Sequence, residues 1–162
     1  AVHAAVAVWL SAWTGERDVV IGTGVAGRGH PDLAGLVGMF VGTVALRVTV
    51  DPDAAFTTLL AHVRATDIEG FVHASVPFDQ VVEKLGFGPF ELMLSYDNIP
   101  QTAPVLSGLD VRVQEFDSAH ARFDLELQIR ETGDGALAGR LVYDSACSSR
   151  TPSRCGWNGW VP

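Results

Sequence analysis

Three glycines in a short, strongly apolar stretch are the first residues whose spacing points to a chemistry. Gly22, Gly24 and Gly27 form a G-x-G-x-x-G pattern within residues 19–30, directly after a run typical of a strand. In dinucleotide sites, a helix that begins at the third glycine presents its free N–H groups to a pyrophosphate. The segment that would form this helix carries Pro31 and further glycines, and each interior glycine costs about 1 kcal/mol relative to alanine. The sequence therefore favours a loop that needs close backbone approach over a nucleotide site.

A second candidate for chemistry is His120, which precedes Asp124 in an H-x-x-x-D spacing. A histidine oriented by a carboxylate is a common general base. Here no second histidine precedes His120 and no glycine follows Asp124, and a two-residue spacing of this kind is common by chance. His120 is the one catalytic candidate that we take from the sequence.

The other histidines offer no further site. His3 and His62 are expected on helix faces, whereas His30 and His73 are expected in loop or helix-edge positions. No cysteine or acidic residue clusters with them in the sequence, so we expect no metal site.

Composition narrows the class of protein. The chain has 162 residues, of which 48% are hydrophobic, and a net charge of −8. These values indicate one globular domain and argue against binding to nucleic acid or to an anionic membrane. The two cysteines, Cys147 and Cys155, form neither a disulfide framework nor a zinc motif, and the start lacks the basic segment of a secretory signal. We therefore expect a cytoplasmic protein.

Hydrophobic periodicity predicts an α/β domain with a mixed β-sheet flanked by helices. The G-D-G sequence at 133–135 predicts a hairpin between the last two strands. The expected helices are Ala1–Trp13, Asp53–Phe71 and Phe78–Leu85, and the expected strands are Asp18–Val25, Val41–Val50, Phe90–Tyr96, Leu109–Phe116, Phe123–Arg130 and Ala136–Tyr143.

Several blocks of sequence resemble the condensation domains of nonribosomal peptide synthetases. Residues 20–28 read VIGTGVAGR, and residues 38–47 read GMFVGTVALR. Further along come HASVPFDQVVEKLG, PFELMLSYDN and ARFDLELQIRETGDGALAGRLVYDS. These blocks are similar to motifs of the C-terminal lobe of that family, occur in the family's order and cover nearly all of Ala1–Ser145. Two residues depart from the family pattern, since Gly24 replaces a proline and Gly42 replaces an asparagine, and both changes are expected to loosen a loop.

The resemblance implies a lobe with a chloramphenicol-acetyltransferase-like fold. It also implies amide formation between thioesters that carrier proteins hold on phosphopantetheine arms, with no cofactor bound to the chain itself. The family's H-H-x-x-x-D-G motif belongs to an N-terminal lobe, which would be a partner, and is absent here. Thr23, Arg28, Ser95 and Asn98 are the polar candidates for the substrate tunnel or its loops. Equally, Arg28 could form a salt bridge that holds the loop, and Thr23 and Asn98 could cap turns.

Three functions remain open at this stage. The chain could be half of a condensation enzyme, inactive alone because it lacks the histidine motif. It could be a non-catalytic module that binds a carrier or another partner, with an exposed apolar face that favours association. It could also be a self-sufficient acyltransferase that works as a homo-oligomer, with His120 as the base.

The tail from Ala146 to Pro162 departs from the resemblance. Its sequence, ACSSRTPSRCGWNGWVP, has no hydrophobic period and is rich in Trp, Cys and Arg. With GC-rich codons, a shifted reading frame would give a sequence that ends in a V-x-R-L helix, which is the family pattern. We therefore expect a frame slip here, with an ordinary disordered terminus as the alternative.

Overall fold

The structure is a computed structural model, and it describes residues 1–86, 90, 92–97, 106–112, 114, 122–132 and 135–144. The elements follow the predicted order closely. They are α1 (Val2–Thr14), β1 (Asp18–Val25), the 3₁₀ helix η1 (Pro31–Leu33), β2 (Gly42–Thr49), α2 (Phe56–Val72), α3 (Phe78–Leu85), β3 (Leu92–Asp97), β4 (Leu125–Glu131) and β5 (Leu137–Tyr143).

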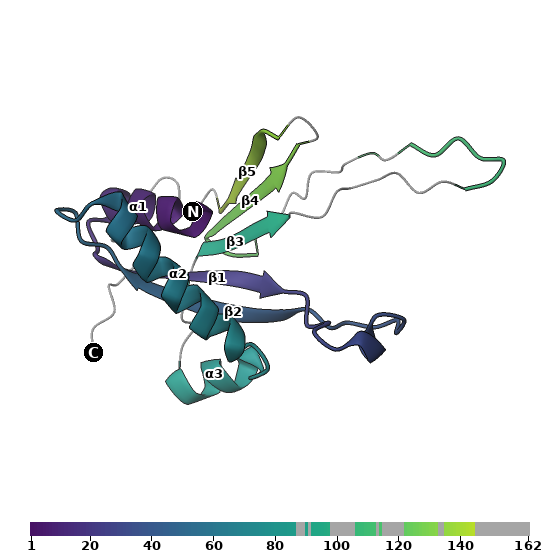
Figure 1. Cartoon of the computed structure of the whole chain (residues 1–162), viewed down its shortest axis with the longest axis horizontal. Helices are drawn as coiled ribbons and strands as arrows, with labels where there is room; N and C mark the ends of the chain where they lie inside the picture. Colours follow the sequence, from purple (N-terminus) through teal and green to yellow (C-terminus); the bar gives the residue numbers. More distant parts are fainter. Residues whose placement is uncertain are drawn as a thin grey trace.

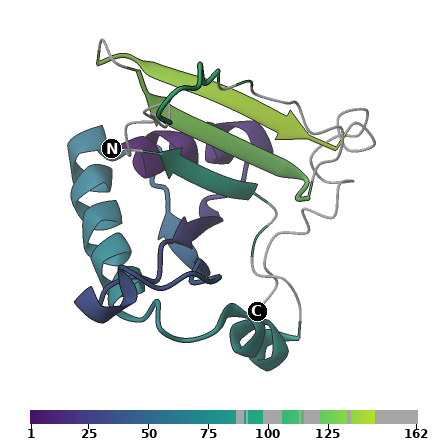
Figure 2. The ribbon, with the colours of Figure 1, turned by 90° about the vertical axis from the view of Figure 1, so that its right-hand side faces the viewer.

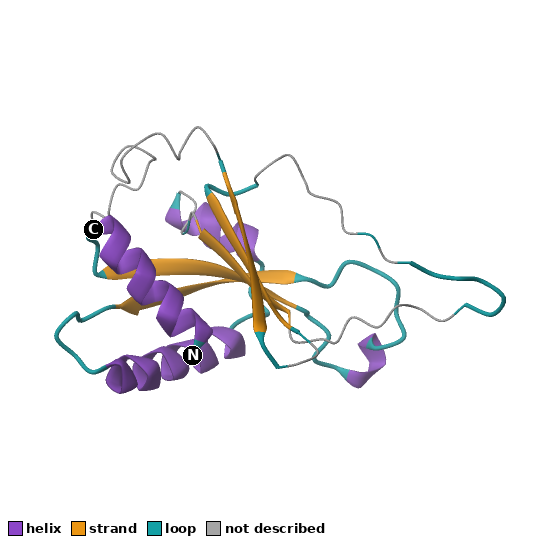
Figure 3. Cartoon of the chain, turned by 90° about the horizontal axis from the view of Figure 1, so that it is seen from above, coloured by secondary structure: helices purple, strands orange, loops and turns teal. Residues whose placement is uncertain are grey.

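The five strands form one mixed sheet in the order β2-β1-β3-β4-β5. The outer pairs, β1 with β2 and β4 with β5, are antiparallel, whereas β3 pairs in parallel with β1 and β4. The sheet is strongly twisted when it is seen from above (Figure 3), as the chirality of the strands requires. The prediction of an α/β fold with a mixed sheet flanked by helices is therefore confirmed.

The hydrophobic core lies between one face of this sheet and the helices α1 and α2. Leu10 from α1, Val63 from α2 and Ile21, Val48 and Leu92 from the strands are almost fully buried in it. Alternate residues of each strand face this layer, because successive side chains of a strand point to opposite faces. Figure 2 shows α2 standing beside the sheet, and Figure 1 shows α3 near the β2 edge, which it contacts.

Local chemistry sets the helix boundaries. Gly15 and Gly86 end α1 and α3 in the left-handed conformation, with φ of 80° and 77°, which glycine adopts without steric cost. The predicted start of the second helix at Asp53 is wrong by three residues. The Asp51 carboxylate accepts a hydrogen bond from the Asp53 N–H, and this local turn delays α2 until Phe56.

The predicted strand over Leu109–Phe116 is also wrong for the part that the structure describes. Residues 106–112 form a turn, in which the Leu109 N–H donates to the Leu106 carbonyl and Gly108 has a φ of 78°. This segment projects far from the sheet (Figure 1), and none of the described strands lies beside it to form a ladder. The last hairpin is confirmed, since β4 and β5 pair along their full length and Gly135 has a φ of 81°.

Two segments project from the same end of the sheet. The loop of residues 26–41, which contains η1, connects the end of β1 to the start of β2. The turn of residues 106–112 lies beyond the end of β3, which runs parallel to β1. Both extend to the same side in two views of the molecule (Figures 1 and 3).

Candidate functional site

The glycine pattern does not build a nucleotide site. The described residues after Gly27 contain only the three-residue η1 before β2, and β2 is antiparallel to β1. A dinucleotide fold needs a longer helix there, which leads into a parallel strand. The structure therefore supports the interpretation that these glycines serve backbone packing.

Two of the three glycines are required by close neighbours. A Cβ on Gly22 would lie 2.2 Å from the ring of Phe90, and a Cβ on Gly27 would lie 1.8 Å from the Phe40 carbonyl oxygen. Gly27 also has a φ of 66°, which side-chain-bearing residues rarely adopt. Gly24 has open space around its Cβ position and pairs with Thr43 within the ladder.

Arg28 holds the loop of residues 26–41 together. Its guanidinium donates hydrogen bonds to the carbonyls of Leu33 at 2.5 Å, Leu36 at 2.9 Å and Gly38 at 3.4 Å. It also lies over the Phe40 ring, with 4.2 Å between the guanidinium carbon and the ring centroid. The hypothesis that Arg28 holds the loop through a salt bridge is wrong in its chemistry, because Arg28 has no ion pair within the described part of the chain. Backbone carbonyls and an aromatic ring hold it instead.

Thr23 and Gly42 belong to the strands and not to a turn. The Thr23 hydroxyl donates to the Leu94 carbonyl at 2.9 Å, which ties β1 to β3. Gly42 pairs with Val25 at the first position of β2. The prediction that Thr23 caps a turn is therefore wrong, and the glycine substitution at 42 lies in a paired strand end and not in a free loop.

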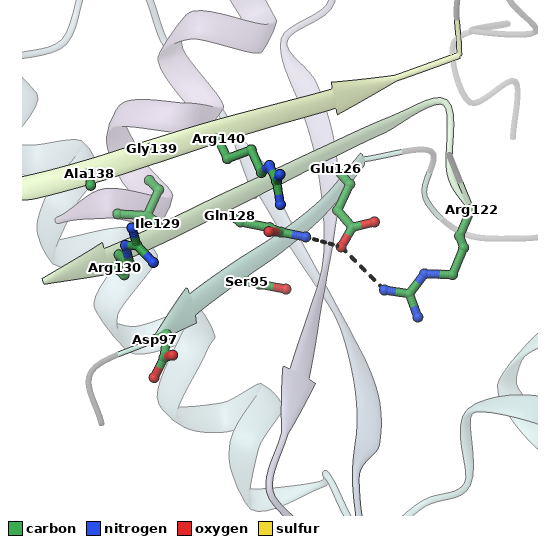
Figure 4. A pocket seen from close by; sticks show the side chains of 10 residues that line it. All are labelled: Ser95, Asp97, Arg122, Glu126, Gln128, Ile129, Arg130, Ala138, Gly139 and Arg140. Carbon is green, nitrogen blue, oxygen red and sulfur yellow. Dashed lines mark hydrogen bonds and ion pairs between the residues drawn. The ribbon is translucent and has the colours of Figure 1, made fainter. Parts of the chain in front are cut away.

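The face of the sheet that points away from α1 and α2 carries polar rows on β3, β4 and β5. The strand register sets three rows, and each row takes one residue from each of these strands. Polar side chains prevail in two of them (Figure 4). The rows are Met93–Glu126–Val142, Ser95–Gln128–Arg140 and Asp97–Arg130–Ala138. The structure thus places the predicted candidate Ser95 in the middle row.

Glu126 is the one buried carboxylate among the described residues, with 5% of its surface exposed. Its Oε1 accepts a hydrogen bond from the Gln128 amide at 2.8 Å and forms an ion pair with Arg122 at 3.3 Å (Figure 4). Burial of a carboxylate is costly unless such donors compensate it. The two donors therefore explain how Glu126 can lie in the sheet.

The polar rows line a pocket of about 550 Å³ (Figure 4). Its walls contain three arginines and two carboxylates besides Ser95 and Gln128. The charged lining residues are Asp97, Arg122, Glu126, Arg130 and Arg140. The volume is in the range of pockets that bind small molecules, so this pocket is the candidate functional site of the described chain.

Sequence reasoning missed Glu126, Gln128 and Arg140 as pocket residues. The signal was present, because residues 125–131 read LELQIRE, with apolar and polar residues alternating. That alternation places the polar side chains on one face of a strand. Only the strand register, which the sequence does not give, shows that Ser95 and Arg140 share a row with Gln128.

The remaining predicted candidates do not join this site. Asn98 and His120 lie outside the described residues. Asp124, the partner proposed for His120, has a pKa above its usual value, because burial disfavours its charged form and the Asp144 carboxylate repels it. Its backbone carbonyl accepts a hydrogen bond from the Asp144 N–H at 3.2 Å.

Three of the described histidines, His3, His30 and His73, serve the fold. His30 Nδ1 accepts a hydrogen bond from the Asp32 N–H at the start of η1, and His73 ends α2, which matches their predicted loop and helix-edge positions. His3 differs from the prediction of a plain helix-face residue. It is 93% buried, and its Nδ1 lies 2.7 Å from an Asp67 carboxylate oxygen on α2, so it links the two helices of the core layer.

Two other kinds of feature are absent from the described part of the chain. The described residues contain no group of three His, Cys, Asp or Glu side chains that could hold a metal ion. Nor do they include a helix with the length and apolar character to cross a membrane.

Comparison with protein families matches residues 1–150 to the condensation domain. Surfactin synthase subunit 1 of Bacillus subtilis is 38% identical over 133 residues, which are 78% of this chain and 4% of that protein. Tyrocidine synthase 3 of Brevibacillus parabrevis is 34% identical over 154 residues, which are 91% of this chain and 2% of that protein. The chain thus spans only a few per cent of the length of these relatives.

Comparison with solved structures gives the same fold. The starter condensation domain of rhizomide synthetase matches 90% of this chain and 35% of its own, with a TM-score of 0.78 and 26% identity. The X-domain from teicoplanin biosynthesis matches 91% of this chain and 37% of its own, with a TM-score of 0.76. At 23% identity the second likeness shows the fold alone.

Proposed function

The chain belongs to the condensation-domain family of nonribosomal peptide synthetases, and we propose that residues 1–145 are the C-terminal lobe of such a domain. The lobe would have a chloramphenicol-acetyltransferase-like fold. It would contribute to peptide-bond formation between aminoacyl or peptidyl thioesters that carrier proteins present on phosphopantetheine arms. The order of the sequence blocks over Ala1–Ser145 supports this assignment.

The observation that carries the proposal concerns the loop of residues 26–41. This loop is held in place by internal contacts, yet it exposes apolar side chains to solvent. Val37 is fully exposed and Met39 is 87% exposed. The loop that presents them is nevertheless fixed by the four contacts of Arg28. An ordered loop with an apolar tip is typical of a protein interface, and a second lobe is the partner that the family resemblance implies.

A second projecting segment adds to this surface. Leu106 and Leu109 are 51% and 68% exposed on the turn of residues 106–112. The turn extends to the same side of the sheet as the loop of residues 26–41 (Figure 1). One partner could therefore cover both segments.

The reaction requires few groups. The acceptor amine attacks the donor thioester carbonyl, a C–N bond forms, the C–S bond breaks, and the amine proton passes through a base to the leaving thiolate. The sequence contains no two adjacent histidines, so the base would come from the partner lobe. This chain would supply a wall of the substrate space, and the phosphopantetheine would arrive on the carriers, with no cofactor held by the chain.

Reconstitution with a separately expressed N-terminal lobe tests the proposal. We expect amide product from two aminoacyl-loaded carrier proteins, measured by mass spectrometry, only when both lobes are present. Val37→Asp should weaken lobe association in sizing chromatography. Val72→Asp, a control at an exposed position of α2, should leave association unchanged. Product formation by this chain alone would overturn the two-lobe proposal and favour the homo-oligomeric acyltransferase.

The same surface supports an alternative function, in which the chain is a non-catalytic module that captures a carrier or another partner. The exposed apolar tip favours it equally, because capture needs an interface and no catalytic base. Binding of the N-terminal lobe without any amide product would support this alternative.

The origin of the tail from Ala146 to Pro162 stays a proposal, because the described residues end at 144. We propose that a frame slip produced it, so that Cys147 and Cys155 carry no function. The coding DNA tests this directly. A shifted frame that encodes a V-x-R-L helix supports the slip, and an early stop codon in that frame contradicts it.

A further inference from the structure

We propose that the solvent-facing side of α1, together with the neighbouring end of β5, binds a second copy of this chain in an antiparallel pair with two-fold symmetry. This inference does not rest on the proposed function, because it concerns a different surface. Figure 1 places α1 at the opposite end of the molecule from the loop of residues 26–41. The inference rests on the apolar character of the whole helix, on the area that is exposed, and on the order of small and large residues along it.

The composition of α1 is the first argument. The helix contains no Asp, Glu, Lys or Arg, and its one histidine, His3, is buried. Its solvent-facing side is apolar as well, and there Trp9 and Trp13 stack with 5.6 Å between their ring centroids. The exposed residues of this side are Ala5, Val8, Trp9, Ala12 and Trp13. A helix that is hydrophobic all round is normally covered on every side, so we expect this side to have a cover.

The apolar surface continues from α1 onto β5. Tyr143 lies opposite Leu125 and Leu141 lies opposite Leu127, on the face of the sheet that packs against α1. Leu125 is buried, whereas Leu141 and Tyr143 are 45% and 52% exposed. Figures 1 and 2 both show α1 beside β4 and β5. One cover could therefore lie on α1 and on the end of β5 together.

The exposed area is sufficient for a reversible dimer. Trp9 and Trp13 are 40% and 48% exposed, and Val8 is 38% exposed. With the two alanines and the end of β5, this surface offers roughly 500 Å² per copy. Two copies that cover each other would bury roughly 1,000 Å² in total, which is the lower limit for a specific interface.

Charge favours a second copy over a lipid surface. Each copy has a net charge of −8, so two copies can associate only where few charges meet, and the side of α1 described above carries none. Helices that lie on membranes carry basic residues on the side opposite their apolar side. The opposite side of α1 lies in the protein core instead.

The order of residues along α1 is self-complementary. Ala5, Trp9 and Trp13 are four residues apart, so they lie in one row on the helix. When two copies of α1 cross in antiparallel orientation with the two-fold axis at Trp9, Ala5 of each copy lies opposite Trp13 of the other. The small alanine leaves room for the indole ring, and symmetry forms this contact twice.

Sedimentation equilibrium of the full chain tests the inference, at about 1 to 200 µM protein. A thiol reductant keeps Cys147 and Cys155 from forming disulfides between copies. We expect a monomer–dimer equilibrium with a micromolar Kd, as suits an interface of this size. Ala5→Glu and Trp13→Lys should each raise the Kd by about tenfold or more, because each change enters the interface twice.

Val37→Asp is the control for the surface. It changes an exposed apolar residue on the loop of residues 26–41 and should leave the Kd of self-association unchanged. The proposed function expects the same variant to weaken association with the N-terminal lobe. The two proposals can therefore fail independently of each other.

A mixture of the Ala5→Glu and Trp13→Lys chains tests the orientation. In a mixed dimer, the new carboxylate lies opposite the new ammonium in one contact, and the other contact keeps its alanine and tryptophan. We therefore expect mixed dimers with a Kd close to that of the parent protein, measured by sedimentation with a fluorescent label on one chain. Circular dichroism shows whether both variants are folded.

Several results would overturn the inference. They are a monomer at every concentration, unchanged self-association in Ala5→Glu and Trp13→Lys, equal weakening by Val37→Asp, or no mixed dimer from two folded variants. Binding of the N-terminal lobe that is lost in Ala5→Glu would assign this surface to that lobe instead. Binding to phosphatidylcholine vesicles that is lost in Trp13→Lys would assign it to a lipid surface.

Discussion

The guanidinium of Arg28 stacks over the ring of Phe40 with 4.2 Å between its carbon and the ring centroid. The same guanidinium binds three carbonyls from the segment between these two residues. One side chain thus closes the whole loop that carries the exposed Val37 and Met39. A planar guanidinium can stack and donate in several directions at once, whereas an ammonium group cannot.

Arg28→Lys should therefore loosen the loop while the core stays intact. We expect faster hydrogen exchange at the amides of residues 33–40 and a loss of less than about 1 kcal/mol in the free energy of unfolding, since the contacts are exposed. Exchange measured by mass spectrometry checks this. Arg64→Lys on α2 is the matched control, and equal exchange rates in the two variants would contradict the role given to Arg28.

The three glycines of the G-x-G-x-x-G pattern should respond differently to alanine. In Gly27→Ala, the added Cβ would lie 1.8 Å from the Phe40 carbonyl oxygen, and the backbone φ of 66° disfavours a side chain. We therefore expect a loss of about 1–3 kcal/mol in the free energy of unfolding. Gly22→Ala should also destabilise, because the Phe90 ring must move. Gly24→Ala has open space and should be neutral or stabilising, by up to about 1 kcal/mol. Urea unfolding of the three variants tests this order, and a destabilised Gly24→Ala would contradict it.

The sequence was sufficient for most of the elements and for the family, and the reason lies in the local signals. The strand Asp18–Val25 and the helix Phe78–Leu85 were predicted to the residue, because Pro77, Gly86 and a continuous apolar run mark their limits. The predicted strand at Leu109 failed because a strand needs a neighbour, and no local pattern shows whether one is present.

The candidate site was harder to predict because it depends on register. Ser95 was predicted as a site residue from the sequence block PFELMLSYDN. Its position beside Gln128 and Arg140, however, follows only from the pairing of β3, β4 and β5. Likewise, the bonds of Thr23 to Leu94 and of Arg28 to three carbonyls end on backbone atoms. Any residue can supply a carbonyl, so the sequence gives no sign of such partners.

The pair formed by the buried His3 and the half-buried Asp67 leads to a prediction for stability. The Nδ1 of His3 lies 2.7 Å from the Asp67 carboxylate, whereas its buried Nε2 has no hydrogen-bond partner among the described residues. Asp67→Ala would leave a second ring nitrogen unpaired, so we expect a loss of about 1–3 kcal/mol. The double variant His3→Leu with Asp67→Ala should lose less than Asp67→Ala alone, since no polar group is then left unpaired.

Urea unfolding of the His3 and Asp67 variants measures this difference as a double-mutant cycle. Strictly additive losses would contradict the role of the pair. The single variant His3→Leu completes the cycle and measures the loss of the Asp67 contact together with the packing of the apolar replacement.

Tyr96 should titrate above its ordinary pKa of 10.0. Its hydroxyl donates to the Glu131 carboxylate, and this bond raises the pKa of the phenol, with smaller contributions from desolvation and from the carboxylate charge. The sequence has two tyrosines, so ultraviolet titration of a Tyr143→Phe variant reports on Tyr96 alone. Glu131→Gln should lower the Tyr96 pKa, and an unchanged titration curve would contradict this assignment.

The sign of the linkage for Tyr96 follows from the direction of its shift. A pKa raised in the folded state means that the folded protein holds the phenol proton more tightly than the unfolded chain. The stabilisation is therefore present below the unfolded pKa near 10 and is lost as the pH rises through the folded value. Tyr96→Phe should show less of this alkaline loss in urea unfolding.

Asp124 should have the opposite effect on stability at neutral pH. Burial, and then repulsion by Asp144, raise its pKa above its ordinary value of 3.8. The folded state therefore resists ionisation of this carboxyl, and ionisation at neutral pH works against folding. Asp124→Asn should thus be more stable than the parent protein above the folded pKa, and the gain should shrink as the pH falls through that value and vanish below 3.8.

Urea unfolding across this pH range, together with carboxyl NMR of the parent protein, tests the effect of Asp124. Asp144→Asn should lower the Asp124 pKa only in part, because burial is the larger cause and remains in that variant. A pH-independent difference between Asp124→Asn and the parent would show that the substitution acts through packing and not through the charge. A complete return of the pKa in Asp144→Asn would show instead that repulsion by Asp144, and not burial, governs this carboxyl.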